Sequence, residues 1–178
     1  MNTQPSELAW LAIARREIGT REIAGKEHNS KIRNWLIALG AWWQDDETPW
    51  CGTFVAHCAR EAKRALPQHW YRAKDWLNTG TRLEHPAYGC VVVFDRVGGG
   101  HVGFVVGKDK LGNLMVLGNL MVLGGNQGNA VNIKPFAMSR VAGYVWLDWA
   151  DGRKSAPKPE RFELPLLDSN GQVSRNER

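Results

Sequence analysis

The stretch PWCGTFVAHC, residues 49–58, holds two cysteines and a histidine in ten positions. Thr48 is a good helix cap and Pro49 suits the first helical position, so a helix is predicted to begin here with Cys51 as its third residue. Unpaired N–H groups and the positive end of the helix dipole favour a thiolate at such a place. Cys51 is therefore the candidate nucleophile, and the alternative is a small buried residue on an apolar stripe. Gly52 beside it would leave room for a substrate backbone.

The other two reactive side chains of this stretch are poor candidates for chemistry. Cys58 falls on the apolar stripe of the predicted helix, so core packing is expected for it. His57 lies six residues after Cys51, about 9 Å along the axis and on another face, which excludes it as the base of that thiol and places it at the surface. The spacing of these residues matches no zinc pattern, so no metal site is predicted.

A base is offered by GGGHVGFVVG, residues 98–107, where His101 begins a predicted strand directly after three glycines. A solvent-facing histidine is the alternative. Imidazole needs a third group to fix its tautomer, and the candidates follow the next strand in LGGNQGN. Asn126 is the predicted orienting residue. Gln127 and, more weakly, Asp95 remain open as alternatives.

Periodicity predicts the elements that must position these residues. Helical spacing of apolar residues indicates three helices, over residues 6–19, 29–39 and 48–62. A short fourth helix, over residues 70–78, leads into the β-rich part of the chain. Short β-rich runs separated by Gly-containing turns then follow, at 89–94, 101–106, 113–118, 119–124 and 141–147. Helices followed by an antiparallel sheet indicate an α+β fold.

Residues 1–150 are expected to form one catalytic domain and residues 151–178 a flexible polar tail, because the tail contains three prolines and no periodicity. Its FELPLL segment could still dock as a short extended piece. The tandem repeat LGNLMV, residues 111–122, runs straight into LGGNQ. One copy suffices to link the strand of His101 to Asn126, so the other must lengthen a strand or form a loop turning at Gly118 and Asn119.

Composition narrows the class of protein. The chain of 178 residues has a formal net charge of +5 with the charges interspersed, and it shows no basic stripe or nucleic-acid-reading motif. Three cysteines at irregular spacing argue against a disulfide framework. The apolar stretch at 8–14 does not read as a signal peptide, and no run is long enough to span a membrane. Synthesis in the cytoplasm is expected.

The ordered combination of TPWCGTFV, GCVVVF, GHVGFVVG and a polar residue after the following strand resembles the CHAP and NlpC-type peptidoglycan amidohydrolases. These are papain-like cysteine hydrolases, and the likeness is greatest to small lysin-like members of phages and prophages. It covers roughly residues 6–147. The resemblance implies Cys51 as nucleophile, His101 as base and Asn126 as orienting residue, with no cofactor. Many relatives have Asp where this chain has Cys90.

The resemblance also implies acyl transfer, in which a Cys51 thiolate paired with His101 attacks an amide carbonyl and water releases the acyl-enzyme. The Cys51 N–H is expected to donate to the oxyanion, and Gln44 is a candidate second donor. Tryptophans that flank the predicted site in sequence are expected either to wall a groove for peptide or glycan or to pack in the core: Trp42, Trp43, Trp50 and Trp70.

The predicted function is hydrolysis of amide bonds in peptidoglycan by a monomer, as a lysin or a delivered antibacterial toxin that acts on the wall after release. An effector would also require an immunity or delivery partner. The alternatives are a cysteine peptidase, deamidase or acyltransferase acting on protein, and an inactive wall-binding module. The sequence leaves open which peptidoglycan bond is cut.

Overall fold

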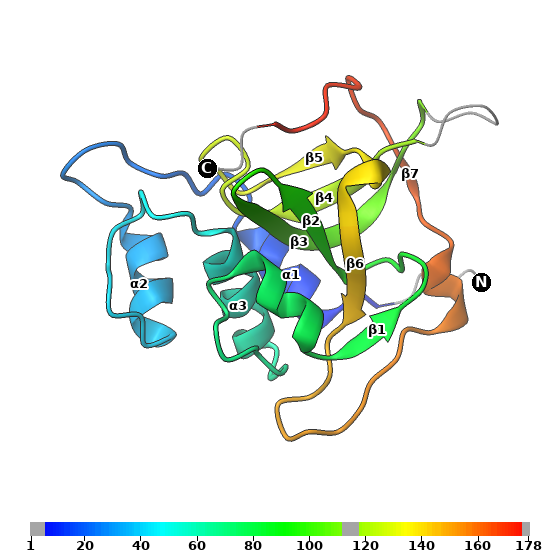
Figure 1. Cartoon of the computed structure of the whole chain (residues 1–178), viewed down its shortest axis with the longest axis horizontal. Coiled ribbons are helices and arrows are strands. Elements are labelled where there is room, and N and C mark those ends of the chain that lie inside the picture. Colours follow the sequence, from blue (N-terminus) through cyan, green and yellow to red (C-terminus); the bar gives the residue numbers. More distant parts are fainter. Residues whose placement is uncertain (1–5, 112–117, 176–178) are drawn as a thin grey trace.

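The computed structural model describes residues 6–111 and 118–175, which form a layer of helices on one side of a β-sheet (Figure 1). The α-helices come first in the chain: α1 (Ala9–Arg16), α2 (Ser30–Ala38) and α3 (Cys51–Glu61). The 3₁₀-helices are η1 (Ala73–Asn78), η2 (Met138–Arg140) and η3 (Pro159–Phe162). The predicted α+β class is confirmed.

The sheet contains seven strands in the order β1-β6-β2-β3-β4-β5, with β7 paired in parallel to β3. Every other pairing is antiparallel. The strands are β1 (Thr81–Leu83), β2 (Val91–Arg96), β3 (Gly99–Asp109), β4 (Leu120–Gly124), β5 (Asn132–Phe136), β6 (Val141–Trp146) and β7 (Leu166–Leu167).

Helix α3 lies between α2 and the sheet (Figure 1), and its sequence explains how it fits there. Eight of its eleven residues are buried, and most of these are small, such as Gly52, Ala56 and Ala59. Small side chains let a helix approach several neighbours closely, whereas Phe54 and Val55 fill the space toward the core. This packing holds the start of α3 against β3.

The helix ends are set by different means. Asn29 caps α2, since its side chain accepts hydrogen bonds from the N–H groups of Lys31 and Ile32. Helix α1 begins at Ala9, later than the predicted start at residue 6, and no side chain caps it. Helix α3 also begins later than predicted, with Trp50 in the cap position.

Strands β2 and β3 form a tight hairpin through Val97 and Gly98, and Gly98 has the positive φ of 78° that such a turn requires. The register pairs Phe94 with His101 and Arg96 with Gly99. Strand β4 pairs with the far part of β3, from Lys108 to Phe104, and then turns away at Gly124. This divergence leaves the start of β3 open to the N-terminus of α3.

Strand β4 comes from the second copy of the tandem repeat, as Leu120, Met121 and Val122. Asn119 precedes it, and its N–H and side-chain amide donate to the buried Asp109 carboxylate at 3.0 and 2.7 Å. Residues 112–117, which include most of the first copy, lie outside the described residues, so the role of the duplication stays a prediction.

The C-terminal segment packs on the domain, in contrast to the predicted flexible tail. Its FELPLL stretch supplies β7, and the N–H of Lys108 donates to the Pro165 carbonyl at 3.0 Å. Arg161 is buried, its carbonyl accepts from the Tyr88 N–H at 2.7 Å, and the N–H of Ser174 donates to the Pro135 carbonyl at 2.9 Å. The FELPLL stretch thus docks as a short extended piece, the possibility that the sequence left open.

Deleting residues 151–178 should therefore destabilise the protein by at least about 2 kcal/mol, since each lost hydrogen bond contributes about 1 kcal/mol. Urea denaturation of the full and shortened chains measures this difference. An unchanged midpoint would show that the segment contributes nothing to the fold.

Candidate active site

Cys51 is the first residue of α3 and is 4% exposed. The N–H of Phe54 makes the first helical hydrogen bond, to the Trp50 carbonyl at 3.0 Å. The N–H groups of Cys51, Gly52 and Thr53 thus precede the hydrogen-bond ladder and face the site. Cys51 stands two residues earlier in its helix than the sequence predicts, but still at the positive end of the dipole.

The thiol of Cys51 lies against β3. It accepts hydrogen bonds from the backbone N–H groups of Val102, the residue after His101, and of Gly52. Burial nevertheless raises the pKa of Cys51, and these N–H groups and the charge of Arg96 oppose the rise only in part. The direction of this shift opposes the predicted resting thiolate, because burial has the largest effect on the pKa of the thiol.

His101 is fully buried, and its Nε2 lies 3.1 Å from Oε1 of Gln127. The amide nitrogen of Gln127 donates to the Val122 carbonyl and to two oxygens of Asn132, at 2.9–3.2 Å. These three acceptors fix the amide orientation, so Oε1 must face the imidazole and accept the Nε2 proton. His101 then has an unprotonated Nδ1, the atom that can accept a proton from a thiol.

Aromatic rings hold the imidazole plane. His101 stacks on Phe136 with a centroid distance of 5.0 Å and an interplanar angle of 1°, and Phe94 lies 6.3 Å away on the same face of the sheet. Arg140 lies over the rings of both phenylalanines, and its guanidinium donates to the backbone carbonyls of Asp95 and Ser174. The ring of His101 is therefore fixed by packing as well as by Gln127.

Asn126, the predicted orienting residue, does not make the hydrogen bond to His101. Asn126 has a φ of 58°, in the left-handed region, and this turn brings the longer side chain of Gln127 to the imidazole instead. Both polar side-chain atoms of Asn126 are buried without a hydrogen-bond partner among the described residues. The side chain that contacts the imidazole is therefore that of Gln127, the alternative that the sequence left open.

Two adjacent glycines let this turn fit between α3 and His101. A Cβ atom on Gly124 would lie 2.3 Å from Oε1 of Gln127, and one on Gly125 would lie 2.6 Å from Cβ of Phe54. Both distances are too short for non-bonded atoms. A side chain at either glycine would therefore push the turn away from the helix or from the histidine. The LGGNQ sequence thus couples the Cys51 helix to the base.

The space beside Gly52 is filled by the protein itself. A Cβ atom there would lie 2.5 and 2.8 Å from the backbone carbonyl oxygens of Trp70 and Tyr71. The expectation that Gly52 makes room for a substrate backbone is wrong, because the segment before η1 already occupies that room.

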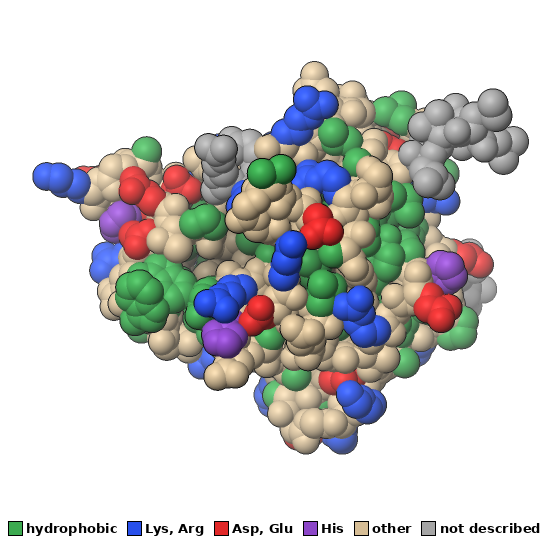
Figure 2. Space-filling view, in the orientation of Figure 1, with side chains coloured by type: hydrophobic (Ala, Val, Ile, Leu, Met, Phe, Trp, Pro, Cys, Tyr) green, Lys and Arg blue, Asp and Glu red, His purple; other side chains and the backbone are tan. Residues whose placement is uncertain are grey.

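An aromatic cluster adjoins this contact. Trp43 stacks on Trp70 at 5.8 Å and meets Tyr71 edge-on at 5.2 Å, and Trp42, which is 89% exposed, packs edge-on against Trp43. Hydrophobic atoms reach the surface on the α2 side of the view in Figure 2. Trp50 is different, since it is 1% exposed and packs in the core. Three of the four tryptophans therefore remain candidates for a groove wall.

The remaining predicted residues lie outside this arrangement. Gln44 is exposed, and its Oε1 accepts from Arg33 on α2 at 3.3 Å, which gives no support to its predicted oxyanion role. His57 is half-buried and stacks on Trp35 at 4.8 Å, whereas a surface position was predicted. Cys58 is fully buried in the core, as predicted, and burial raises its pKa well above the usual value. Asp95 pairs with Lys74 at 2.8 Å.

Cys90 is fully buried, and burial raises its pKa to about 12. Its neighbour Gly89 accepts a hydrogen bond from the Trp10 indole at 2.8 Å. Cys90 is thus a core residue between α1 and the sheet.

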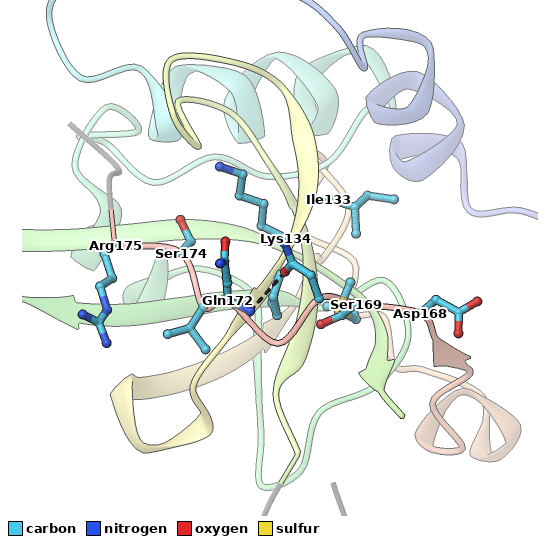
Figure 3. A pocket seen from close by; sticks show the side chains of 11 residues that line it. Ile133, Lys134, Asp168, Ser169, Gln172, Ser174 and Arg175 are labelled. Carbon is cyan, nitrogen blue, oxygen red and sulfur yellow. Dashed lines mark hydrogen bonds between the residues drawn. The ribbon is translucent and has the colours of Figure 1, made fainter. Parts of the chain in front are cut away.

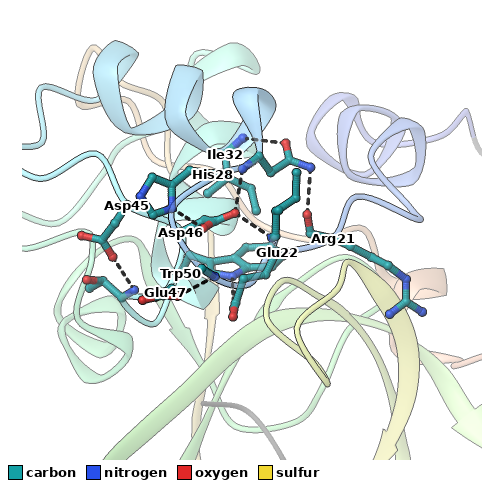
Figure 4. A network of polar contacts seen from close by, with 12 residues as sticks. Arg21, Glu22, His28, Ile32, Asp45, Asp46, Glu47 and Trp50 are labelled. Atoms are coloured by element: carbon teal, nitrogen blue, oxygen red, sulfur yellow. Dashed lines mark hydrogen bonds and ion pairs between the residues drawn. The ribbon is translucent and has the colours of Figure 1, made fainter.

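A polar network around Asp46 fixes the loop that leads into α3 (Figure 4). The fully buried carboxylate accepts from the N–H groups of Ile23 and Asn29 at 2.9 and 2.8 Å and pairs with His28 at 2.9 Å. Burial acts to raise the pKa of Asp46, but these hydrogen bonds outweigh it and hold the pKa below its usual value. The sequence analysis did not identify Asp46, although its place five residues before Cys51 is a usable signal.

Replacing Asp46 with Asn should destabilise the protein at pH 7 by about 2 kcal/mol or more, since hydrogen bonds to a charged group are strong. Because the folded-state pKa is lowered, the carboxylate stabilises the fold above about pH 4, and this contribution disappears as the pH falls through the folded value. Urea denaturation of both proteins from pH 7 downward measures the difference. A difference in the free energy of unfolding between the two proteins that stays constant with pH would contradict this account.

Two pockets in the described part of the chain lie away from Cys51 and His101. The larger, about 580 Å³, lies between β5 and the C-terminal segment and is lined by Lys134, Asp168, Gln172 and Arg175 among others (Figure 3). Another, of about 330 Å³, includes Trp10, Arg64 and Trp146. Neither contains Cys51 or His101. Within residues 6–111 and 118–175, no group of three or more His, Cys, Asp or Glu side chains is placed to hold a metal ion.

One family model matches a part of the chain. Residues 43–126 match the family model described as the CHAP domain, a stretch that begins at Trp43 and includes Cys51, His101 and Asn126. No curated protein and no solved structure matches the chain. None of the helices in the described part of the chain is long and apolar enough to cross a bilayer.

Proposed function

We propose, from the match of residues 43–126 to the CHAP domain, the cysteine- and histidine-dependent domain of peptidoglycan amidohydrolases, that this chain hydrolyses an amide bond of peptidoglycan through Cys51 and His101. The observation that carries the proposal is the hydrogen bond between His101 and Gln127, which leaves Nδ1 as a proton acceptor beside the strand residue that contacts the Cys51 thiol.

In the proposed mechanism, Nδ1 of His101 takes the thiol proton as Cys51 sulfur attacks the amide carbonyl. The negative charge that develops on the carbonyl oxygen is stabilised at the start of α3, where the Cys51 N–H precedes the hydrogen-bond ladder. The imidazolium then protonates the departing amine, and a thioester remains on Cys51. A water molecule, deprotonated by His101, hydrolyses the thioester and restores the thiol.

Burial of Cys51 and His101 affects their protonation before the reaction begins. A neutral thiol beside a neutral imidazole costs less in a buried site than a thiolate–imidazolium pair. We therefore propose proton transfer during attack in place of the resting ion pair that the sequence predicted. Gln127 supports the imidazolium in both half-reactions, because its Oε1 accepts the Nε2 proton throughout.

Digestion of purified peptidoglycan tests the function. The wild-type protein should release new amino groups, and mass spectrometry of the soluble fragments should show which amide is broken; the His101→Ala variant should release none. Cleavage of protein substrates alone would favour a cysteine peptidase. Binding to the wall without any release of amino groups would contradict the proposal and indicate an inactive binding module.

A further inference from the structure

The larger pocket, of about 580 Å³, has two walls that are far apart in the sequence (Figure 3). One wall is made by residues of β4 and β5, among them Lys134 and Pro135, and the other by the C-terminal segment between Asp168 and Arg175. Its volume is within the range of pockets that bind small molecules. The pocket is therefore large enough to hold a ligand that contacts both walls.

The hydroxyl of Ser174 lines this pocket and lacks a partner. Ser174 is 5% exposed, and its Oγ is buried with no hydrogen-bond partner among the described residues. The backbone of Ser174 is fixed, because its N–H donates to the Pro135 carbonyl at 2.9 Å and its carbonyl accepts from Arg140 at 3.1 Å. Buried hydroxyls are nearly always hydrogen-bonded, since an unpaired one is costly. A ligand in the pocket would supply the missing partner.

The charge of the pocket lining is positive. Lys134 and Arg175 both line it, and neither forms an ion pair with another described residue. Asp168 is the acidic residue of the lining, and its carboxylate pairs with Lys110 at 2.9 Å. In Figure 3 the side chains of Lys134, Ser174 and Arg175 lie on the same side of the pocket, and Asp168 lies at the opposite end. Two unpaired cations and an unpaired hydroxyl favour an anionic ligand.

We propose that this pocket binds a phosphate ester of a sugar or polyol, with Lys134, Ser174 and Arg175 as donors to the phosphate oxygens. A phosphate monoester carries up to two negative charges and three terminal oxygens, so it can accept from donors that approach from several directions. A carboxylate has one charge and two oxygens in a plane, which a single guanidinium satisfies. The inference goes beyond the proposed function and does not depend on it, because no lining residue takes part in the proposed mechanism.

The polar lining next to these donors suits the sugar or polyol part of such a ligand. The side-chain amide of Gln172 lines the pocket and offers both a donor and an acceptor, as hydroxyl groups require. The N–H of Gln172 donates to Oδ1 of Asn170 at 3.0 Å, drawn as a dashed line in Figure 3, and this contact holds the turn that carries both amides.

The experiment measures the binding of glycerol phosphate to the full chain by calorimetry. Glycerate, in which a carboxylate replaces the phosphate, and glycerol itself are the comparison ligands. The wild-type protein should bind glycerol phosphate at least about 10-fold more tightly than glycerate, and glycerol not measurably. The diester of phosphate with two glycerols distinguishes the source of the group: tighter binding of the diester indicates a phosphate-linked polymer, and tighter binding of the monoester indicates a free sugar or polyol phosphate.

Substitutions locate the binding site. Lys134→Gln and Arg175→Gln should each raise the Kd for glycerol phosphate about 10-fold, because each removes a charged donor. Lys158→Gln is the matched control, since it removes the same charge at the smaller pocket, and it should leave the Kd unchanged. Ser174→Ala removes a hydroxyl without a partner, so the urea midpoint without ligand should stay the same or rise while the Kd rises about fivefold.

The outcomes separate this site from the proposed function. No binding of glycerol phosphate by the wild-type protein, or equal binding of glycerate, would refute a phosphate site. A Kd that stays unchanged in both Lys134→Gln and Ser174→Ala would show that the ligand binds elsewhere. Each of these results leaves the hydrolysis of peptidoglycan through Cys51 as it was, and His101→Ala should bind glycerol phosphate like the wild type.

Discussion

Replacing Cys51 with Ser should abolish peptidoglycan hydrolysis, with a fall in kcat of at least about 10³-fold, while the protein keeps its fold. A serine hydroxyl is a much poorer nucleophile than a thiol. The side chains are nearly the same size, so the packing of α3 against β3 should persist. Release of amino groups from purified walls measures activity, and circular dichroism with thermal melting checks the fold.

Cys58→Ser is the matched control, since it makes the same chemical change two helical turns further along α3. Cys58 is fully buried, and a hydroxyl there should cost about 1–3 kcal/mol of stability but little activity. An inactive but folded Cys58→Ser together with an active Cys51→Ser would reverse the assignment of the nucleophile.

The parts of the site that the sequence predicts are those that depend on local pattern. The helix predicted over residues 29–39 is observed as α2, and the apolar stripe of residues 51–62 places Cys58 in the core whatever the exact start of the helix. His101 begins a run of alternating small and apolar residues next to glycines. Nearest neighbours in the chain determine these features, so one sequence is enough to find them.

The parts that the sequence misses depend on contacts between distant segments. The start of α3 shifts because the Thr48 N–H donates to Asp45 at 2.7 Å, which holds Thr48 in a turn before the helix. Residues 166–167 become a strand only because β3 offers its edge. Arg96 could have been found, since a two-residue turn at Val97 and Gly98 pairs it with Gly99, but its relation to Cys51 needs the packing of α3.

Removing the side chain of Gln127 should lower kcat for peptidoglycan fragments by about 10²-fold or more, with a small effect on KM. In Gln127→Ala, the Nε2 proton of His101 loses its acceptor, so the imidazole can adopt the tautomer in which Nδ1 carries the proton and cannot accept one from Cys51. Steady-state kinetics on soluble fragments separates kcat from KM. Because Gln127 also binds Asn132, the Asn132→Ala variant measures how much of the loss comes from a loosened turn.

Asn126→Gly is the sharpest control for this assignment, because it changes the neighbouring residue that the sequence favoured. Glycine adopts the φ of 58° without strain, and the substitution removes two buried polar atoms that have no hydrogen-bond partner among the described residues. Stability should therefore stay within about 1 kcal/mol of the wild type, and kcat within a few fold. If Asn126→Gly loses as much kcat as Gln127→Ala while Asn132→Ala stays active, Asn126 and not Gln127 serves the base, and the orientation of His101 derived from its 3.1 Å contact with Gln127 is wrong.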